Sequence, residues 1–259
     1  MEEMDREVSQ ASESEAPRMS EVATLSSIFF EPGAVFEDLR RKPRFLIAGL
    51  ITVLLISAYS FGVYYKIGDA GMRSYIASEI EKSPRTQNMD PAQKKAAVDM
   101  QVNFSGYGRY AVPVIIAISF LIGGLFYWGA GKAFGSVAGF KDALAIWIYS
   151  GFPPVVLSML LSFVVMAFKS ADDIDIAASQ RGLLHANLGF LIDGKASPVL
   201  ATILSVFDLF SIWGWILAAI GLKIMGKLSS GSAWAIVLFF ALIGVGFRLV
   251  GAIFSGNPS

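Results

Sequence analysis

Five long apolar runs constrain this chain more than any other feature of its sequence. They cover residues 45–65, 110–131, 143–168, 198–222 and 233–254. Each run has about 20 residues or more, and a helix of that length crosses a hydrocarbon core of about 30 Å. A water-soluble chain of 259 residues would not need five such runs. The sequence therefore predicts an all-α integral membrane protein, with five transmembrane helices in a bundle.

The composition agrees with a membrane protein and narrows its chemistry. Charged residues make up 16% of the chain, against about 25% in typical soluble domains. The formal net charge is zero, so bulk electrostatics favour no nucleic-acid partner. The chain has no cysteine, which excludes disulfides and zinc–thiolate sites. We expect membrane lipids as its first partners.

The polar parts of the chain divide it into segments. Residues 1–21 carry seven acids and two bases, and such a segment cannot bury enough apolar surface to order itself, so we predict a disordered acidic tail. Residues 22–44 are predicted to form a cytosolic interfacial segment, and residues 45–254 the transmembrane domain. Within that domain, residues 66–109 form an outer loop. Asp90 followed by Pro91 resembles a helix start, so this loop is predicted to be a helical hairpin.

The interfacial segment combines an apolar face with a basic cluster. Pro32 suits a first helical turn, and Val35, Phe36 and Leu39 then fall on one helix face. This pattern predicts a short amphipathic helix lying in the membrane surface. Four basic residues that follow at once are predicted to contact lipid headgroups: Arg40, Arg41, Lys42 and Arg44. Because these charges crowd beside the first span, they also predict a cytoplasmic N-terminus and, after five spans, a C-terminus outside.

Only two charged residues interrupt the apolar runs, Asp208 and Arg248. Charges inside a membrane are costly and usually face a bundle interior or a partner. Asp208 lies ten residues after Pro198, or about 15 Å along a helix, and Arg248 lies about 9 Å from the outer end of the antiparallel fifth run. Arginine can cover that difference. The favoured interpretation is a structural ion pair, and the alternative is a transport site for a proton, ion or polar substrate.

Two further patterns concern helix shape and packing. Pro153 and Pro154 are consecutive in the third run, and their missing hydrogen bonds predict a helix break or kink. Gly131, Gly135 and Gly139 recur every four residues, a spacing that lets helix backbones approach closely. Packing within the chain is the favoured interpretation of the glycines. Contact with a second copy or with another membrane protein is the alternative.

The sequence contains none of the motifs that mark a catalytic or phosphate-binding site. It has no phosphate loop, no serine nucleophile elbow and no His-Glu-x-x-His zinc motif. We therefore predict no catalytic residues, no cofactor site and no metal site.

Three stretches of the sequence together resemble a known family. Residues 27–32 read Ser-Ile-Phe-Phe-Glu-Pro, with Phe36 and a basic stretch around Pro43 following; residues 140–154 run from Phe-Lys-Asp-Ala through Tyr149 to Pro-Pro; residues 207–213 read Phe-Asp-Leu-Phe-Ser-Ile-Trp, with Ala-Ile-Gly-Leu at 219–222. This pattern resembles the Yip-one domain family of five-span membrane proteins. The resemblance covers about residues 25–254 and implies a cytosolic N-terminus. It implies no catalytic residues.

The resemblance bears on location and role. Eukaryotic relatives bind Rab GTPases in vesicle trafficking, but the long 66–109 loop differs from their compact form. The chain therefore looks like a bacterial member, which implies the inner membrane and no Rab partner. The leading hypothesis is a non-enzymatic protein that organises, scaffolds or shapes the membrane. The alternatives are a small transporter or channel that uses Asp208 and Arg248, and an accessory subunit of a membrane complex.

Overall fold

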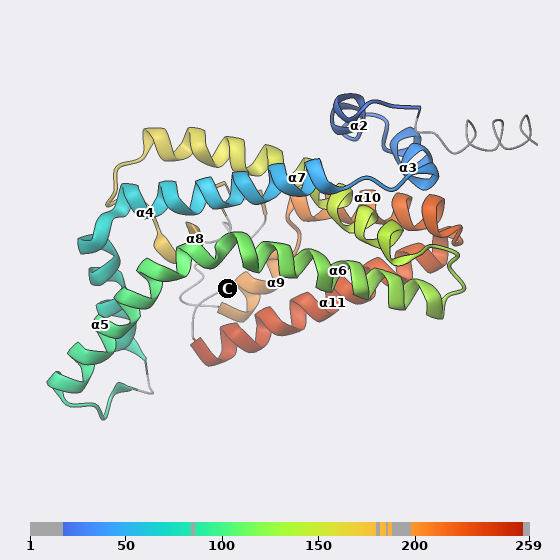
Figure 1. Cartoon of the computed structure of the whole chain (residues 1–259). Helices are drawn as coiled ribbons and strands as arrows, with labels where there is room; N and C mark the ends of the chain where they lie inside the picture. Colours follow the sequence, from blue (N-terminus) through green and yellow to red (C-terminus); the bar gives the residue numbers. More distant parts are fainter. Residues whose placement is uncertain (1–17, 84–85, 180–181, 185, 188–197, 256–259) are drawn as a thin grey trace, which may run out of the picture. The chain divides into compact units, whose positions relative to one another are not determined.

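A computed structural model describes residues 18–83, 86–179, 182–184, 186–187 and 198–255. No strand occurs among these residues, and their helices follow in the order shown in Figure 1. They are α2 (Glu21–Ser27), α3 (Pro32–Arg41), α4 (Leu46–Lys82), α5 (Pro91–Gly108), the 3₁₀ turn η2 (Arg109–Ala111), α6 (Val112–Ala133), α7 (Phe140–Phe168), α8 (Ile176–Ser179), α9 (Pro198–Ser205), α10 (Leu209–Gly226) and α11 (Ser230–Ser255).

Five helical stretches are long and apolar enough to cross a membrane. They are Leu46–Lys82, Pro91–Ala133, Phe140–Phe168, Leu209–Gly226 and Ser230–Gly251. Many large apolar side chains on them are exposed, as Leu125, Leu242 and Phe247 illustrate. A protein in water would not leave so much apolar surface open. The prediction of an all-α membrane protein with five spans is confirmed.

The chain divides into two compact units. One holds Met1–Thr52, Ala117–Val155 and Ser211–Ile243, and the other holds Val53–Ile116, Val156–Phe210 and Gly244–Ser259. The first unit thus contains the N-terminal segment and the two short connections that follow α6 and α10. Those connections meet, because the Val137 N–H donates to the Gly226 carbonyl at 3.2 Å. The second unit contains the two long connections, of which the structure describes only part.

In the first unit, glycine lets α6 approach α7 closely. A Cβ on Gly123 would lie 2.0 Å from the Trp147 ring, and one on Gly124 would lie 3.2 Å from the Leu144 backbone. Within lipid the hydrophobic effect does not drive helices together, so close van der Waals contacts of this kind hold them. The glycines that recur every four residues behave differently. A Cβ on Gly131 would meet only the nearby Ser136, and Gly135, with φ of +81°, forms the turn after α6.

In the second unit, α4 and α5 form a helical hairpin. Helix α4 continues well beyond the predicted 45–65 span, with one non-helical residue at Gly68 (φ 72°, ψ 172°). Ile76, Ile80 and Val98 bury one another between the two helices. Asp90 caps α5 through a capping box with Gln93, as its sequence predicts.

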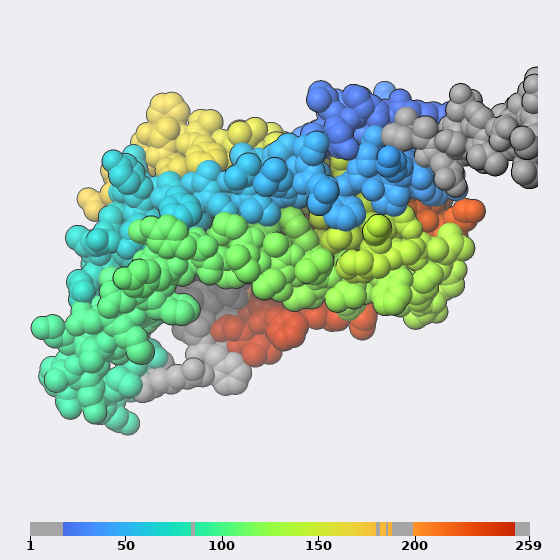
Figure 2. Space-filling model, viewed as in Figure 1, coloured from blue at the N-terminus to red at the C-terminus, as the bar shows by residue number. Residues whose placement is uncertain are grey.

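The first two spans contact each other within each unit; Figure 2 shows the surface of the chain in the colours of Figure 1. Within the first unit, a Cβ on Gly49 would lie 3.5 Å from the Phe120 ring. Within the second, the rings of Phe61 and Tyr110 meet edge to face with centroids 5.3 Å apart. The first two spans are therefore neighbours in each unit.

The prolines do not interrupt the third span. Helix α7 runs from Phe140 to Phe168 with Pro153 and Pro154 inside it, so the predicted break is wrong, and the alternative of a kink stays a prediction. Proline frees the carbonyl four residues earlier, which for Pro154 is that of Ser150. A Cβ on Gly214 of α10 would lie 3.5 Å from this carbonyl oxygen. Membrane helices tolerate proline where a neighbouring helix covers the freed group.

The fourth apolar run breaks instead. The sequence predicts one helix over residues 198–222, but the structure has α9 ending at Ser205 and α10 beginning at Leu209. Asp208 lies at the break, where its Oδ1 accepts the backbone N–H of Phe210 at 3.0 Å. Aspartate competes for backbone donors in this way and favours helix starts over helix interiors. Asp208 therefore lies at a helix start and not inside a helix.

Candidate functional site: a buried polar cluster

The N-terminal segment folds onto the first unit as two short helices, α2 and α3. Ser20 caps α2 by accepting the Ala23 N–H, and Pro32 begins α3. The apolar face of α3 has no solvent exposure at Val35, Phe36 or Leu39. The Phe36 ring packs where Gly221 leaves room, since a Cβ there would lie 2.9 Å from that ring. The prediction that this face lies in lipid is therefore wrong, because α10 offers it a protein surface.

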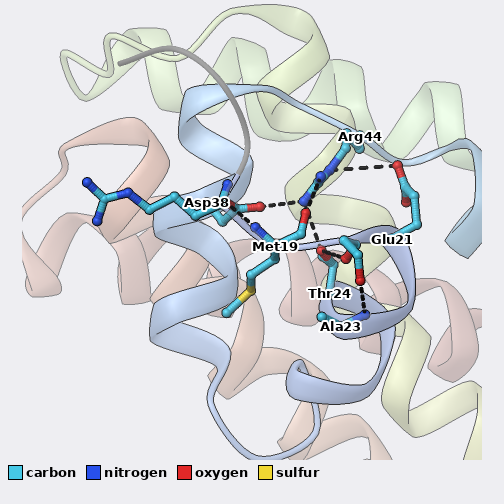
Figure 3. Close-up of polar contacts among 8 residues, drawn as sticks. Met19, Glu21, Ala23, Thr24, Asp38 and Arg44 are labelled. Atoms are coloured by element: carbon cyan, nitrogen blue, oxygen red, sulfur yellow. Dashed lines mark hydrogen bonds and ion pairs between the residues drawn. The ribbon is translucent and has the colours of Figure 1, made fainter. Parts of the chain in front are cut away.

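Arg44 lies at the centre of a polar cluster beneath this segment (Figure 3). Its Nη2 forms an ion pair with Asp38 and donates to Thr24 Oγ1 at 2.8 Å. Its Nη1 donates to the Met19 carbonyl at 2.8 Å. Its Nε lies 3.7 Å from Glu21 Oε1. We call Met19, Glu21, Thr24, Asp38 and Arg44 the N-terminal polar cluster.

Asp38 is the most deeply buried charge of the cluster, with its side chain 4% exposed. Its Oδ1 accepts the backbone N–H groups of Arg18 at 2.5 Å and Met19 at 3.2 Å. A buried carboxylate is tolerated only when it is paired and hydrogen-bonded. Asp38 meets both conditions, and it thereby ties the chain before α2 to α3 and to Arg44.

The four basic residues predicted to contact headgroups do not share one environment. Arg44 is 12% exposed and belongs to the cluster, so the prediction is wrong for this residue. Arg40 is 41% exposed and pairs with Glu37 at 2.7 Å. Lys42 is exposed and Arg41 is half-buried. Headgroup contact stays a prediction for Arg40, Arg41 and Lys42.

Tyr149 of α7 lies next to the cluster. It is fully buried, and it interacts electrostatically with Glu21, Arg44 and Asp38. Its hydroxyl has no hydrogen-bond partner among the described residues. Nearby, the Phe29 ring meets those of Phe152 and Trp213 at centroid distances of 6.1 and 6.0 Å. The first two stretches of the family resemblance thus meet here, with the aromatic part of the third.

Sequence reasoning identified Arg44 but missed its partners. One signal was available: Asp38 lies three residues after Val35 and next to Leu39, on the apolar face of α3. An acidic residue on the buried apolar face of a helix needs a cation beside it, because an unpaired buried charge is strongly destabilising. Glu21 and Thr24 offered no such signal. The predicted disordered tail is wrong at its end, because Ser20 caps α2 and both Met19 and Glu21 contact Arg44, while its first 17 residues lie outside the described residues.

Asp208 and Arg248 both lie in the second unit. Arg248 is half-buried on α11, and Asp208 is half-buried at the start of α10. Their ion pair stays a prediction.

Comparison with known proteins decides the family. The model of the Yip1 domain matches residues 26–252. The chain belongs to the Yip1 domain family. Membrane protein YknW of Bacillus subtilis (strain 168) is 27% identical over 243 residues, which are 92% of this chain and 91% of that protein. No solved structure matches. Two members of the N-terminal polar cluster, Asp38 and Arg44, fall inside the matched region. The other three precede it: Met19, Glu21 and Thr24.

Proposed function

We propose that this Yip1 domain protein is a non-enzymatic scaffold that holds a partner protein in a bacterial inner membrane. The observation that carries the proposal is the N-terminal polar cluster. Its charged side chains form ion pairs with one another and hydrogen bonds with backbone groups. Such a cluster holds α2 and α3 in one position on the bundle, which suits a surface that must be presented to a partner.

One further observation favours a scaffold over a protein that shapes the membrane. The apolar face of α3 is buried within the chain, so membrane shaping by insertion of this helix loses its support. Scaffolding and accessory-subunit roles are compatible with this burial.

A comparison of two matched variants tests the scaffold. The protein would be extracted with its surrounding membrane as native nanodiscs, and its mass and co-purifying chains measured. We expect a stoichiometric partner with the wild type and with Arg40→Leu, which removes an exposed charge. Arg44→Leu should release the partner because it loosens α2 and α3. A wild-type particle that contains this chain and lipid alone would refute the proposal.

A transporter is the second candidate, favoured by the break at residues 206–208. Interrupted membrane helices often form substrate or ion sites, and Asp208 lies at this interruption. Asparagine also caps helices well, so Asp208→Asn should keep the start of α10 while removing the charge. Proton or ion flux into proteoliposomes that Asp208→Asn abolishes would establish transport. Equal and negligible flux for both proteins would exclude a charge-dependent pathway here.

A further inference from the structure

We propose that Arg109 binds the phosphate group of a membrane phospholipid. Arg109 begins the 3₁₀ turn between polar α5 and apolar α6. The chain therefore enters the hydrocarbon directly after this residue. Nothing in the scaffold proposal depends on this site, which lies in the second unit, away from the N-terminal polar cluster in the sequence.

Three aromatic rings lie close to the Arg109 guanidinium. Its Cζ lies 3.9 Å from the centroid of the Tyr64 ring, 5.1 Å from that of Tyr110 and 5.8 Å from that of Phe61. Cation–π contacts of this kind fix the plane of a guanidinium. The group is thus placed before any ligand arrives.

The guanidinium nevertheless lacks an anion. Among the described residues, no carboxylate lies within ion-pair distance of it; its Nη2 makes a long contact of 3.4 Å to Tyr110 Oη, and its side chain also interacts with the Tyr64 hydroxyl. Its Nε is buried with no acceptor in the same part of the chain. Asp69 accepts a hydrogen bond from Tyr64 at 2.5 Å. With five donors and only two tyrosine hydroxyls as acceptors, Arg109 has capacity for an oxyanion.

The apolar runs of the first two spans both end near Arg109. Lys66 and the non-helical Gly68 follow Tyr64 on α4, and a Cβ on Gly106 of α5 would lie 3.4 Å from Tyr64 Oη. Exposed aromatic side chains gather on the same short segments, with Tyr65 89%, Tyr107 77% and Tyr110 61% exposed. Tyrosine is enriched where membranes meet water. Arg109 therefore lies at headgroup depth.

A lipid phosphate suits these observations better than a soluble anion. Guanidinium matches phosphate oxygens as a planar fork, and a phosphodiester is the anion that every phospholipid places at this depth. The exposed rings can pack against the glycerol and upper acyl chain of the same lipid. A free phosphate would leave them without contact.

The test measures thermal unfolding of the full chain in mild detergent with three additives. They are phosphatidylglycerol, diacylglycerol with the same acyl chains, and inorganic phosphate. We expect phosphatidylglycerol alone to raise the unfolding temperature of the wild type. Arg109→Gln should weaken phosphatidylglycerol binding about tenfold or more, since a hydrogen bond to a charged group is lost. Arg109→Lys should keep the charge but lose the fork, and bind with intermediate strength.

The matched control is Arg73→Gln, which removes the same charge from the same hairpin. Arg73 pairs with Asp99 at 2.5 Å and is 51% exposed, so its replacement should leave lipid binding unchanged. Equal stabilisation by diacylglycerol, or equal binding by Arg109→Gln, would overturn the proposal. A shift produced by inorganic phosphate alone would also overturn it, in favour of a soluble anion. If Arg109→Gln does not fold, Arg109→Lys provides the test. Phosphatidylglycerol binding as strong as in the wild type would then refute recognition of the phosphate by a planar guanidinium.

Discussion

At the scale of single residues, Arg44 stabilises the N-terminal segment by neutralising Asp38. Arg44→Leu would leave the carboxylate of Asp38 buried without its cation, and such a loss costs about 3–5 kcal/mol. We expect a large drop in thermal stability, together with faster proteolysis near residue 30. Both can be measured on the purified protein in detergent.

Arg40→Leu is the matched control for this residue, because its pair with Glu37 is exposed on both sides. Exposed pairs contribute about 0–1 kcal/mol. Replacing Asp38 and Arg44 together by leucine should recover part of the loss, since no unpaired charge then remains. Equal effects of Arg44→Leu and Arg40→Leu would show that the cluster contributes little.

At the scale of helices, the docking of α3 on α10 depends on the absence of a side chain at Gly221. Gly221→Ala would place a methyl group 2.9 Å from both Phe36 and Ile146. Overpacking of this kind costs about 1–3 kcal/mol. We expect lower thermal stability and faster hydrogen exchange in α3.

Gly129→Ala provides the comparison, because a Cβ at Gly129 meets nothing within 4 Å. Alanine is also the better helix former, so this variant should match or exceed the wild type. If Gly221→Ala unfolds at the same temperature as Gly129→Ala, the packing of Phe36 against α10 is looser than the structure shows.

The hairpin of α4 and α5 depends on the cap at the start of α5. Asp90→Ala would remove the Oδ1 that accepts the Gln93 N–H at 2.8 Å, while the backbone N–H of residue 90 would keep its bond to Gln93 Oε1. The loss of a cap costs about 1 kcal/mol. Hydrogen exchange should accelerate in the first turns of α5 and remain unchanged in α7. Unchanged protection in α5 would mean that the Ile76, Ile80 and Val98 contacts hold the hairpin alone.

At the scale of the whole molecule, the chain orientation is open to a direct test. The protein has no cysteine, so a single introduced cysteine reports one location. Gln87→Cys lies in the connection between α4 and α5, and Lys141→Cys lies in the first turn of α7; both positions are exposed. With a cytoplasmic N-terminus, an impermeant maleimide should label Gln87→Cys in intact cells and Lys141→Cys only after permeabilisation. The reverse labelling would place the N-terminus outside.

Features that depend only on neighbouring residues could be predicted from the sequence. The length of each apolar run predicted five spans, because every backbone polar group in lipid must be bonded within its own helix. Asp90 and Pro91 predicted the start of α5 for a similarly local reason. The local rule that proline breaks a helix did not hold at Pro153 and Pro154. There the freed Ser150 carbonyl lies close to Gly214 on another helix.

What each amphipathic or charged residue faces depends on the tertiary fold. An apolar face with adjacent arginines fits a lipid surface and a protein surface equally well in sequence. Burial of Phe36 against α10, and the pairing of Arg44 with Asp38, Thr24 and Glu21, depend on contacts distant in the chain. Asp208 shows that the sequence of one run leaves the same choice open. Its carboxylate can pair with a distant cation or cap its own helix. Which choice has the lower free energy is set by the partners that folding brings near.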